Sequence, residues 1–115
     1  MNIYGDRLRR ATSPQEMCWL YHELSRFHTE LKQYELGRVY ARKCMNEAKR
    51  IGNNKWVINS LLLVMRINIA QHSKNDAKSD ASEALELAQT MGDKQLITFL
   101  NKVRLSLVRF FLIGF

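Results

Sequence analysis

A row of small side chains recurs after forty residues and constrains the fold more than any other feature of the sequence. Small residues occupy relative positions 0, 4, 7 and 11 of each copy, which is one stripe of an α-helix. Such a stripe lets a second helix approach closely, because nothing bulky separates the two backbones. The matched residues are Gly37, Ala41, Cys44 and Ala48 in the first copy and Ala77, Ala81, Ala84 and Ala88 in the second.

A glycine follows each copy of the stripe, Gly52 in the first and Gly92 in the second. Glycine ends a helix readily because it can adopt the left-handed conformation that closes the last turn. A helix of small residues, ended by glycine and repeated at a fixed period, indicates a solenoid of helical hairpins.

Helix signals divide the chain into about five antiparallel helices, which form two hairpins and a C-terminal helix. Ser13, followed by proline and three residues later by Glu16, is a typical helix start. We expect Asp76 to cap the fourth helix and Asp93 to cap the fifth. The predicted domains are a basic arm at 1–12, a repeat domain at 13–106 and an apolar tail at 107–115 that continues the last helix. The five helices are expected at about 14–31, 34–51, 55–71, 77–91 and from 94 onward.

Composition excludes several classes of protein. The chain has 115 residues, a net charge of +7 and 46% hydrophobic residues, which suits one folded domain or part of a longer array. No apolar run approaches the ~20 residues that span a bilayer, and no secretory signal is readable. Cys18 and Cys44 lie in helical patterns, so we expect buried thiols in a reducing, cytoplasmic compartment.

The pattern resembles the tetratricopeptide repeat in a forty-residue form. The residues that match are Leu24, Tyr34, Gly37, Ala41, Cys44 and Ala48 in the first unit and Val64, Ala77, Ala81, Ala84 and Ala88 in the second. The sequence departs from the repeat at several places, since Ser25 and Met65 replace small glycine-like residues and His28 and Asn68 replace a tyrosine. The family resemblance implies an all-α solenoid that binds other proteins.

A closer resemblance covers about residues 17–103. The runs WLYHEL at 19–24, ELKQY at 30–34, WVINS at 56–60 and EALELA at 83–88 are similar to the C-terminal repeats of the tetratricopeptide subunit of the ciliary outer dynein arm docking complex. This resemblance implies a scaffold or adaptor in the axoneme of a motile cilium or flagellum, with axonemal docking-complex or dynein-arm proteins as partners. Residues 1–12 and 107–115 do not resemble that family.

The family pattern places the first helix of each hairpin on the inner face of the solenoid. The inner-face residues that it implies are Trp19, His22, Arg26, Thr29 and Glu30 in the first unit and Asn59, Leu62, Arg66 and Ile69 in the second. Relatives that hold a C-terminal carboxylate need a lysine and asparagine set that is incomplete here. Arg26 and Arg66 either contact an acidic partner or are solvated residues with packed stems.

Catalytic, cofactor, metal and nucleic-acid sites find little support. Cys18 and His22 have the spacing of two metal ligands, but no further Cys or His pair completes a site. No nucleophile elbow, phosphate loop or Gly-rich dinucleotide motif occurs, and Asp80 is expected on a solvated face. Arg38, Arg42 and Lys49 are expected to point outward from the second helix, without the interleaved aromatics of a nucleic-acid surface.

The end of the chain is unusually apolar for a terminal solenoid helix, which normally has a polar outer face. Three explanations remain open: it packs back on the hairpins, it self-associates with another chain, or it marks a truncation. The apolar residues are Val103, Leu105, Leu107, Val108, Phe110, Phe111, Leu112, Ile113 and Phe115.

Three functions follow from the sequence. The first is a protein-binding scaffold of the docking-complex type, with no enzymatic activity and no cofactor. The second is a general cytosolic peptide-binding adaptor that uses Arg26 and Arg66. The third is a basic binder of nucleic acid or membrane surfaces that uses the arginine-rich arm and the apolar tail.

Overall fold

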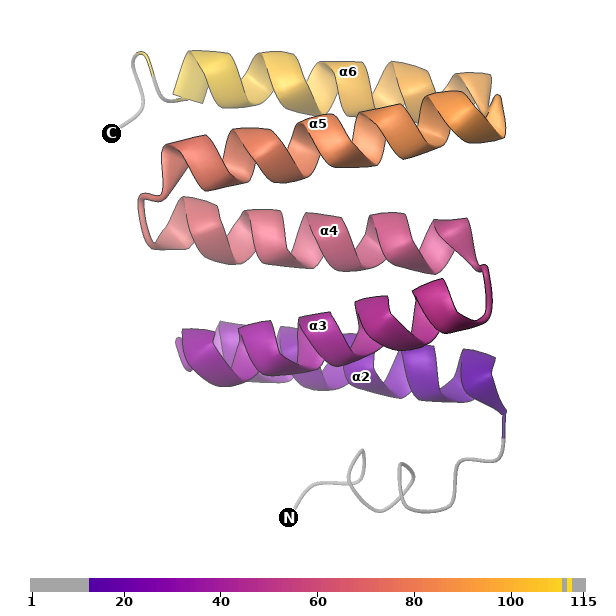
Figure 1. The fold of residues 1–115 in the computed structure, drawn as a ribbon. Helices are drawn as coiled ribbons and strands as arrows, with labels where there is room; N and C mark the ends of the chain where they lie inside the picture. The colour runs from indigo at the N-terminus through magenta and orange to yellow at the C-terminus, as the bar shows by residue number, and fades with distance from the viewer. Residues whose placement is uncertain (1–12, 111, 113–115) are drawn as a thin grey trace.

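Consecutive helices in the computed structural model pack side by side as antiparallel neighbours (Figure 1). The structure describes residues 13–110 and 112, and this part of the chain is helical with short turns. The prediction of an all-α stack of helical hairpins is confirmed. The helices are α2 (Pro14–Glu30), α3 (Tyr34–Arg50), α4 (Asn54–Ala70), α5 (Lys74–Met91) and α6 (Lys94–Arg109).

A left-handed residue recurs every twenty residues and separates each helix from the next. Two of these residues are the predicted glycines, Gly52 with φ 69° and Gly92 with φ 70°. The other two are Lys32 with φ 61° and His72 with φ 59°, which carry a side chain in a conformation that L-residues rarely adopt. The turn is therefore set by the packing of the helices at all four places, and glycine only makes it less costly at two of them.

Side-chain N-caps recur every forty residues, at the first helix of each unit. The side chains of Ser13, Asn53 and Asp93 each accept a hydrogen bond from the amide three residues later, at 3.1 to 3.2 Å. Asp93 is thus the cap that we predicted, but Asp76 is not. Helix α5 begins at Lys74, so Asp76 lies inside its first turn. The left-handed His72 starts the helix earlier than the capping pattern suggested.

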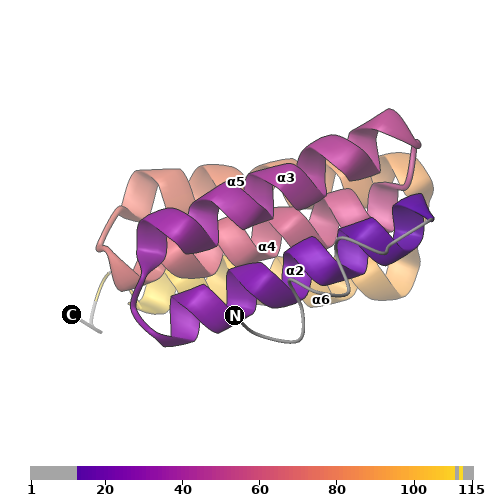
Figure 2. The same cartoon turned by 90° about the horizontal axis from the view of Figure 1, so that it is seen from below.

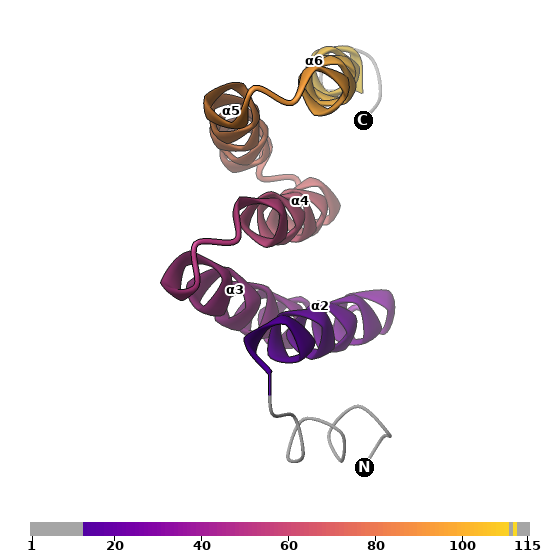
Figure 3. The ribbon, with the colours of Figure 1, turned by 90° about the vertical axis from the view of Figure 1, so that its right-hand side faces the viewer.

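The helices form two layers when the stack is viewed end on (Figure 3). Helices α2, α4 and α6 lie in one layer, and α3 and α5 lie in the other. Seen along the stack in Figure 2, α3 and α5 lie toward the top of the picture and α2 and α6 toward the bottom, with α4 between them. The molecule measures 44 × 33 × 17 Å along its principal axes. The first helices of successive hairpins therefore share one face of the stack.

The two stripes of small residues form the contact between the layers. In α3 the buried residues are the four members of the first stripe and no others, and all four alanines of the second stripe are at most 1% exposed. Larger side chains of α4 fill the space beside them, among them Ile58, Leu61 and Ile67. Helix α4 packs against both α3 and α5, so it is the central helix of the fold.

The apolar residues at the end of the chain differ in burial. Leu105 is 61% exposed, whereas Leu107 is buried beside Ala77 and Ala81. The expected arm at 1–12 lies outside the described residues, and of the expected tail only 107–110 and 112 are described. Within the described part of the chain, every helix falls short of the length or apolar character needed to cross a bilayer.

A half-buried polar network around the buried Asn68 joins three helices where the sequence indicated solvated side chains. Arg38 of α3 donates to the Oδ1 atom of Asn68 at 2.9 Å, and the Nδ2 atom of Asn68 donates to Asp80 of α5 at 2.7 Å. Burial raises the pKa of Asp80 to about 6, against the opposing hydrogen bond from Asn68. Arg38 and Asp80 are therefore inter-helix contacts, because their side chains reach Asn68 on the central helix.

The close contact at Gly37 should make a methyl group costly there. A Cβ atom at this position would lie 2.4 Å from the Oγ1 atom of Thr29 and 3.3 Å from both Ile67 Cδ1 and the Ser25 carbonyl oxygen. We expect Gly37→Ala to lower the free energy of unfolding by about 1–2 kcal/mol, because overpacking outweighs the gain in helix propensity. Urea unfolding followed by circular dichroism measures the change.

The contact can be tested by removing its other partner. The Oγ1 atom of Thr29 is buried without a hydrogen bond, so Thr29→Ala alone should cost little. In the Thr29→Ala background, Gly37→Ala should be neutral or stabilising. An equal loss in both backgrounds would show that this contact does not limit the approach of α3 to α2.

Asp80 should make stability depend on pH. Its pKa of about 6 lies above the ordinary value of 3.8, so the folded protein loses stability as the pH rises from about 4 to 6 and Asp80 ionises. Asparagine cannot ionise, so we expect Asp80→Asn to have a free energy of unfolding about 1–2 kcal/mol higher than that of the wild type near pH 7.5. This is less than the full pKa difference implies, because the Asp80 carboxylate keeps solvent contact. The difference between the two proteins should disappear near pH 4. Urea unfolding at both pH values measures it, and Glu86→Gln, an exposed position on α5, should show no such difference.

Candidate partner-binding surface

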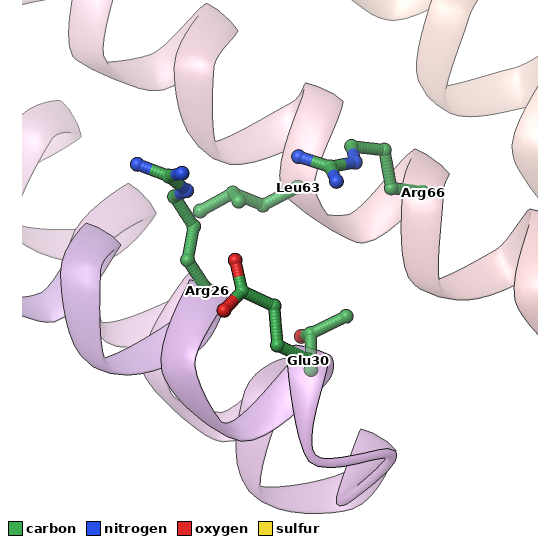
Figure 4. Close-up of a pocket in the computed structure, with 5 residues that line it drawn as sticks. Arg26, Glu30, Leu63 and Arg66 are labelled. Carbon is green, nitrogen blue, oxygen red and sulfur yellow. The ribbon is translucent and has the colours of Figure 1, made fainter.

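A small pocket opens between α2 and α4 on the face that the first helices share. Its volume is about 120 Å³, and its lining residues are Arg26, Thr29, Glu30, Leu63 and Arg66. Figure 4 shows the guanidinium groups of Arg26 and Arg66 extending from opposite helices over Leu63, with the Glu30 carboxylate close to Arg26. The structure thus brings four of the predicted inner-face residues together, Arg26, Thr29, Glu30 and Arg66.

The two arginines of this pocket differ in their availability. Arg26 donates to the Oε2 atom of Glu23 at 3.2 Å, one turn earlier on the same helix, and its side chain is 47% exposed. Arg66 is also exposed, and it forms no hydrogen bond or ion pair with the residues that the structure describes. The positive charge and the N–H donors of the Arg66 guanidinium are therefore available to a ligand. This makes Arg66 the stronger candidate for binding a carboxylate of a partner.

An aromatic contact extends this surface toward the start of α2. The ring of His22 meets Trp56 of α4 edge on, with 5.5 Å between centroids and 67° between planes. Burial lowers the pKa of His22 below 6.5, although the hydrogen bond to Glu23 opposes the change. A neutral His22 therefore adds an aromatic edge to the surface rather than a charge.

The remaining predicted residues lie outside the pocket. Trp19 is 39% exposed and Asn59 is exposed, so both present side chains to solvent. Leu62 is half-buried and packs against two parts of the core. None of the three lines the pocket between α2 and α4.

A larger groove on the same face was not predicted from the sequence, although Ile69, a predicted inner-face residue, is one of its lining residues. It has a volume of about 470 Å³ and lies between α4 and α6. Its lining residues are Met65, Ile69, Phe99, Lys102, Val103, Ser106, Leu107 and Phe110. The forty-residue period contains the signal that could have found it, because the predicted inner-face residues Asn59, Leu62 and Arg66 map onto Phe99, Lys102 and Ser106.

The two cysteines are part of the core. Both thiols are free and fully buried, and the Sγ atom of Cys44 lies 3.3 Å from the Cys18 carbonyl oxygen, to which it donates. Burial raises the pKa of the Cys44 thiol to about 11 and also raises that of Cys18. Among the described residues, no three His, Cys, Asp or Glu side chains gather where they could hold a metal ion.

Comparison with known proteins gives one consistent group of relatives. The chain is 28% identical over 94 residues to outer dynein arm-docking complex subunit 4 of Xenopus laevis, and 27% identical over 93 residues to that of Danio rerio. The mouse protein of the same name is 24% identical over 95 residues. These alignments cover 82%, 81% and 83% of the chain but only 18%, 19% and 15% of the relatives. The resemblance stated from the short runs is confirmed.

The other two comparisons found nothing similar. No protein-family model matches the chain, and no solved structure matches it. The relatives that the chain does match are much longer, and it spans less than a fifth of their length.

The pKa of His22 offers a check on the packing of α2 against α4. A pH titration of the ring protons by NMR should give a pKa below 6.5. Because the folded pKa is depressed, the folded protein should lose stability as the pH falls through about 6.5, when the unfolded chain takes up the proton first. His22→Gln should remove this part of the acid destabilisation. A measured pKa at or above 6.5 would contradict the buried position of the ring beside Trp56.

Proposed function

We propose that this chain is a protein-binding repeat segment that acts as a scaffold in the assembly of axonemal complexes. The observation that carries the proposal is the similarity to outer dynein arm-docking complex subunit 4 across more than four-fifths of the chain. The proposed partners are docking-complex or dynein-arm proteins, and the proposed location is the axoneme of a motile cilium or flagellum.

The arrangement of the described residues supports a role in binding rather than in reaction chemistry. The inner face carries exposed arginines and aromatic rings on two rigid helices, which suits capture of a partner segment by charge and shape. The most strongly shifted carboxyl and thiol groups, Asp80 and Cys44, are held in packing contacts between helices. We propose Trp19, His22, Arg26, Thr29, Asn59, Leu62 and Arg66 as the partner-contacting set of the first two inner helices.

Proximity labelling in cells that build motile cilia tests this proposal. The chain is fused to a labelling enzyme, and we expect enrichment of outer dynein arm and docking-complex proteins among the labelled products. Enrichment of chaperones or trafficking proteins instead would favour a general cytosolic adaptor. Retention of lipid or RNA by the purified chain would favour the third function and contradict the scaffold.

A matched pair of variants assigns the inner face. Arg26→Glu with Arg66→Glu reverses two exposed charges on α2 and α4, and Arg42→Glu with Lys49→Glu reverses two exposed charges on α3. Both pairs change the net charge equally. We expect the first pair to reduce capture of the labelled partner about tenfold or more and the second to leave it unchanged. An equal effect of both pairs would remove Arg26 and Arg66 from the site.

A further inference from the structure

We propose that the groove between α4 and α6 binds an amphipathic helix of a partner protein whose apolar stripe is flanked by acidic residues. The inference rests on the proposed protein-binding role, because it names the kind of partner for that same inner face. It does not depend on the axonemal location. Its starting point is that α4 and α6 leave an apolar groove of about 470 Å³ between them.

The floor and walls of the groove are apolar. Met65 and Ile69 come from α4, Phe99 and Val103 come from α6, and Phe110 directly follows α6. Phe99 is 51% exposed and Phe110 is 38% exposed, so two aromatic rings stand partly in solvent at the ends of the groove. Exposed aromatic side chains of this kind are typical anchors for a protein partner.

The dimensions suit a helix. The lining residues in and directly after α6 run from Phe99 to Phe110, which is roughly 16 Å at the helical rise of about 1.5 Å per residue. A groove of this length between two rigid helices accommodates about three turns of a third helix, which would present side chains at positions i, i+3, i+4 and i+7.

The two helices that form the groove carry cations and no carboxylate. Helices α4 and α6 contain six cationic residues and no aspartate or glutamate, namely Lys55 and Arg66 in α4 and Lys94, Lys102, Arg104 and Arg109 in α6. Lys102 lines the groove itself. Arg109 is exposed seven residues further along the same helical stripe, and Arg66 follows the lining residue Met65. A partner with carboxylates beside its apolar stripe would find a cation on each side.

The charge and the shape of the groove also argue against two other occupants, a second copy of the chain and an anionic membrane. A second copy that paired through its own α6 would bring four cations of one protomer against four of the other, without a carboxylate from either helix. An anionic membrane would satisfy the charge, but a flat surface cannot reach the recessed side chains of Met65 and Leu107, which are 8% and 5% exposed. A narrow acidic helix fits both constraints.

Three synthetic peptides of about 18 residues test the charge requirement. They share one leucine stripe and differ only in its flanks, which carry glutamate, glutamine or lysine. Fluorescence anisotropy measures their binding to the purified chain. We expect the glutamate peptide to bind about tenfold more tightly than the lysine peptide, and the difference to shrink with added salt. Equal binding of all three peptides, or no binding of the glutamate peptide, would overturn the proposal.

Two variants with matched controls locate the binding. Phe99→Ser should weaken the glutamate peptide about tenfold or more, because it removes an exposed anchor of the groove. Leu105→Ser changes an equally exposed apolar residue of α6 that does not line the groove and should have no effect. Lys102→Glu should reverse the preference toward the lysine peptide, whereas Arg104→Glu should not. Circular dichroism confirms that each variant is folded.

The competing occupants have their own measurements. A dimer in analytical ultracentrifugation that Phe99→Ser dissociates would assign the groove to a second copy and overturn the proposal. Binding to phosphatidylserine vesicles that Phe99→Ser abolishes would assign it to a membrane, with the same consequence. Failure of the peptide experiments would leave enrichment of dynein-arm proteins in proximity labelling intact, so the two proposals fail separately.

Discussion

The fold depends on the close approach of two helices that carry almost no side-chain bulk on one face. The packing of α3 against α2 leaves no space for a methyl group at Gly37, where a Cβ atom would meet Thr29, Ile67 and the Ser25 backbone. The alanines of α5 are buried in the same way. Because both small-residue helices lie in one layer, the bulkier α2, α4 and α6 are held in the other, on the same side of the stack (Figure 3).

The sequence predicted this architecture well because small residues leave little ambiguity. An alanine stripe has one physical use in a helix of this composition, and its repetition fixed the period and the pairing of the helices. The burial and contacts of the longer polar and apolar side chains were predicted less well. Arg38 and Asp80 looked solvated by position, yet both reach Asn68 on α4. Leu105 and Leu107 looked equivalent, and only the packing on Ala77 and Ala81 separates them.

The candidate surface was predicted in part. The family pattern indicated the inner helices, and the structure gathers Arg26, Thr29, Glu30 and Arg66 in one pocket between them. The groove beside α6 was missed because the last helix was predicted only as one further helix after the two hairpins, and none of its residues was assigned to the inner face. Its depth also depends on how far α6 lies from α4, which is a property of packing geometry that no single residue encodes.

The charge of the inner face changes along the stack, and this change gives the surface a direction. Helix α2 carries three carboxylates and one arginine, whereas α4 and α6 carry cations only. A partner that lay across all three helices would therefore meet mixed charge at one end and positive charge beside an apolar groove at the other. Opposite orientations of such a partner would differ in energy, since one of them sets like charges against each other. A scaffold with this arrangement can hold its partner in one orientation without any conformational change of its own.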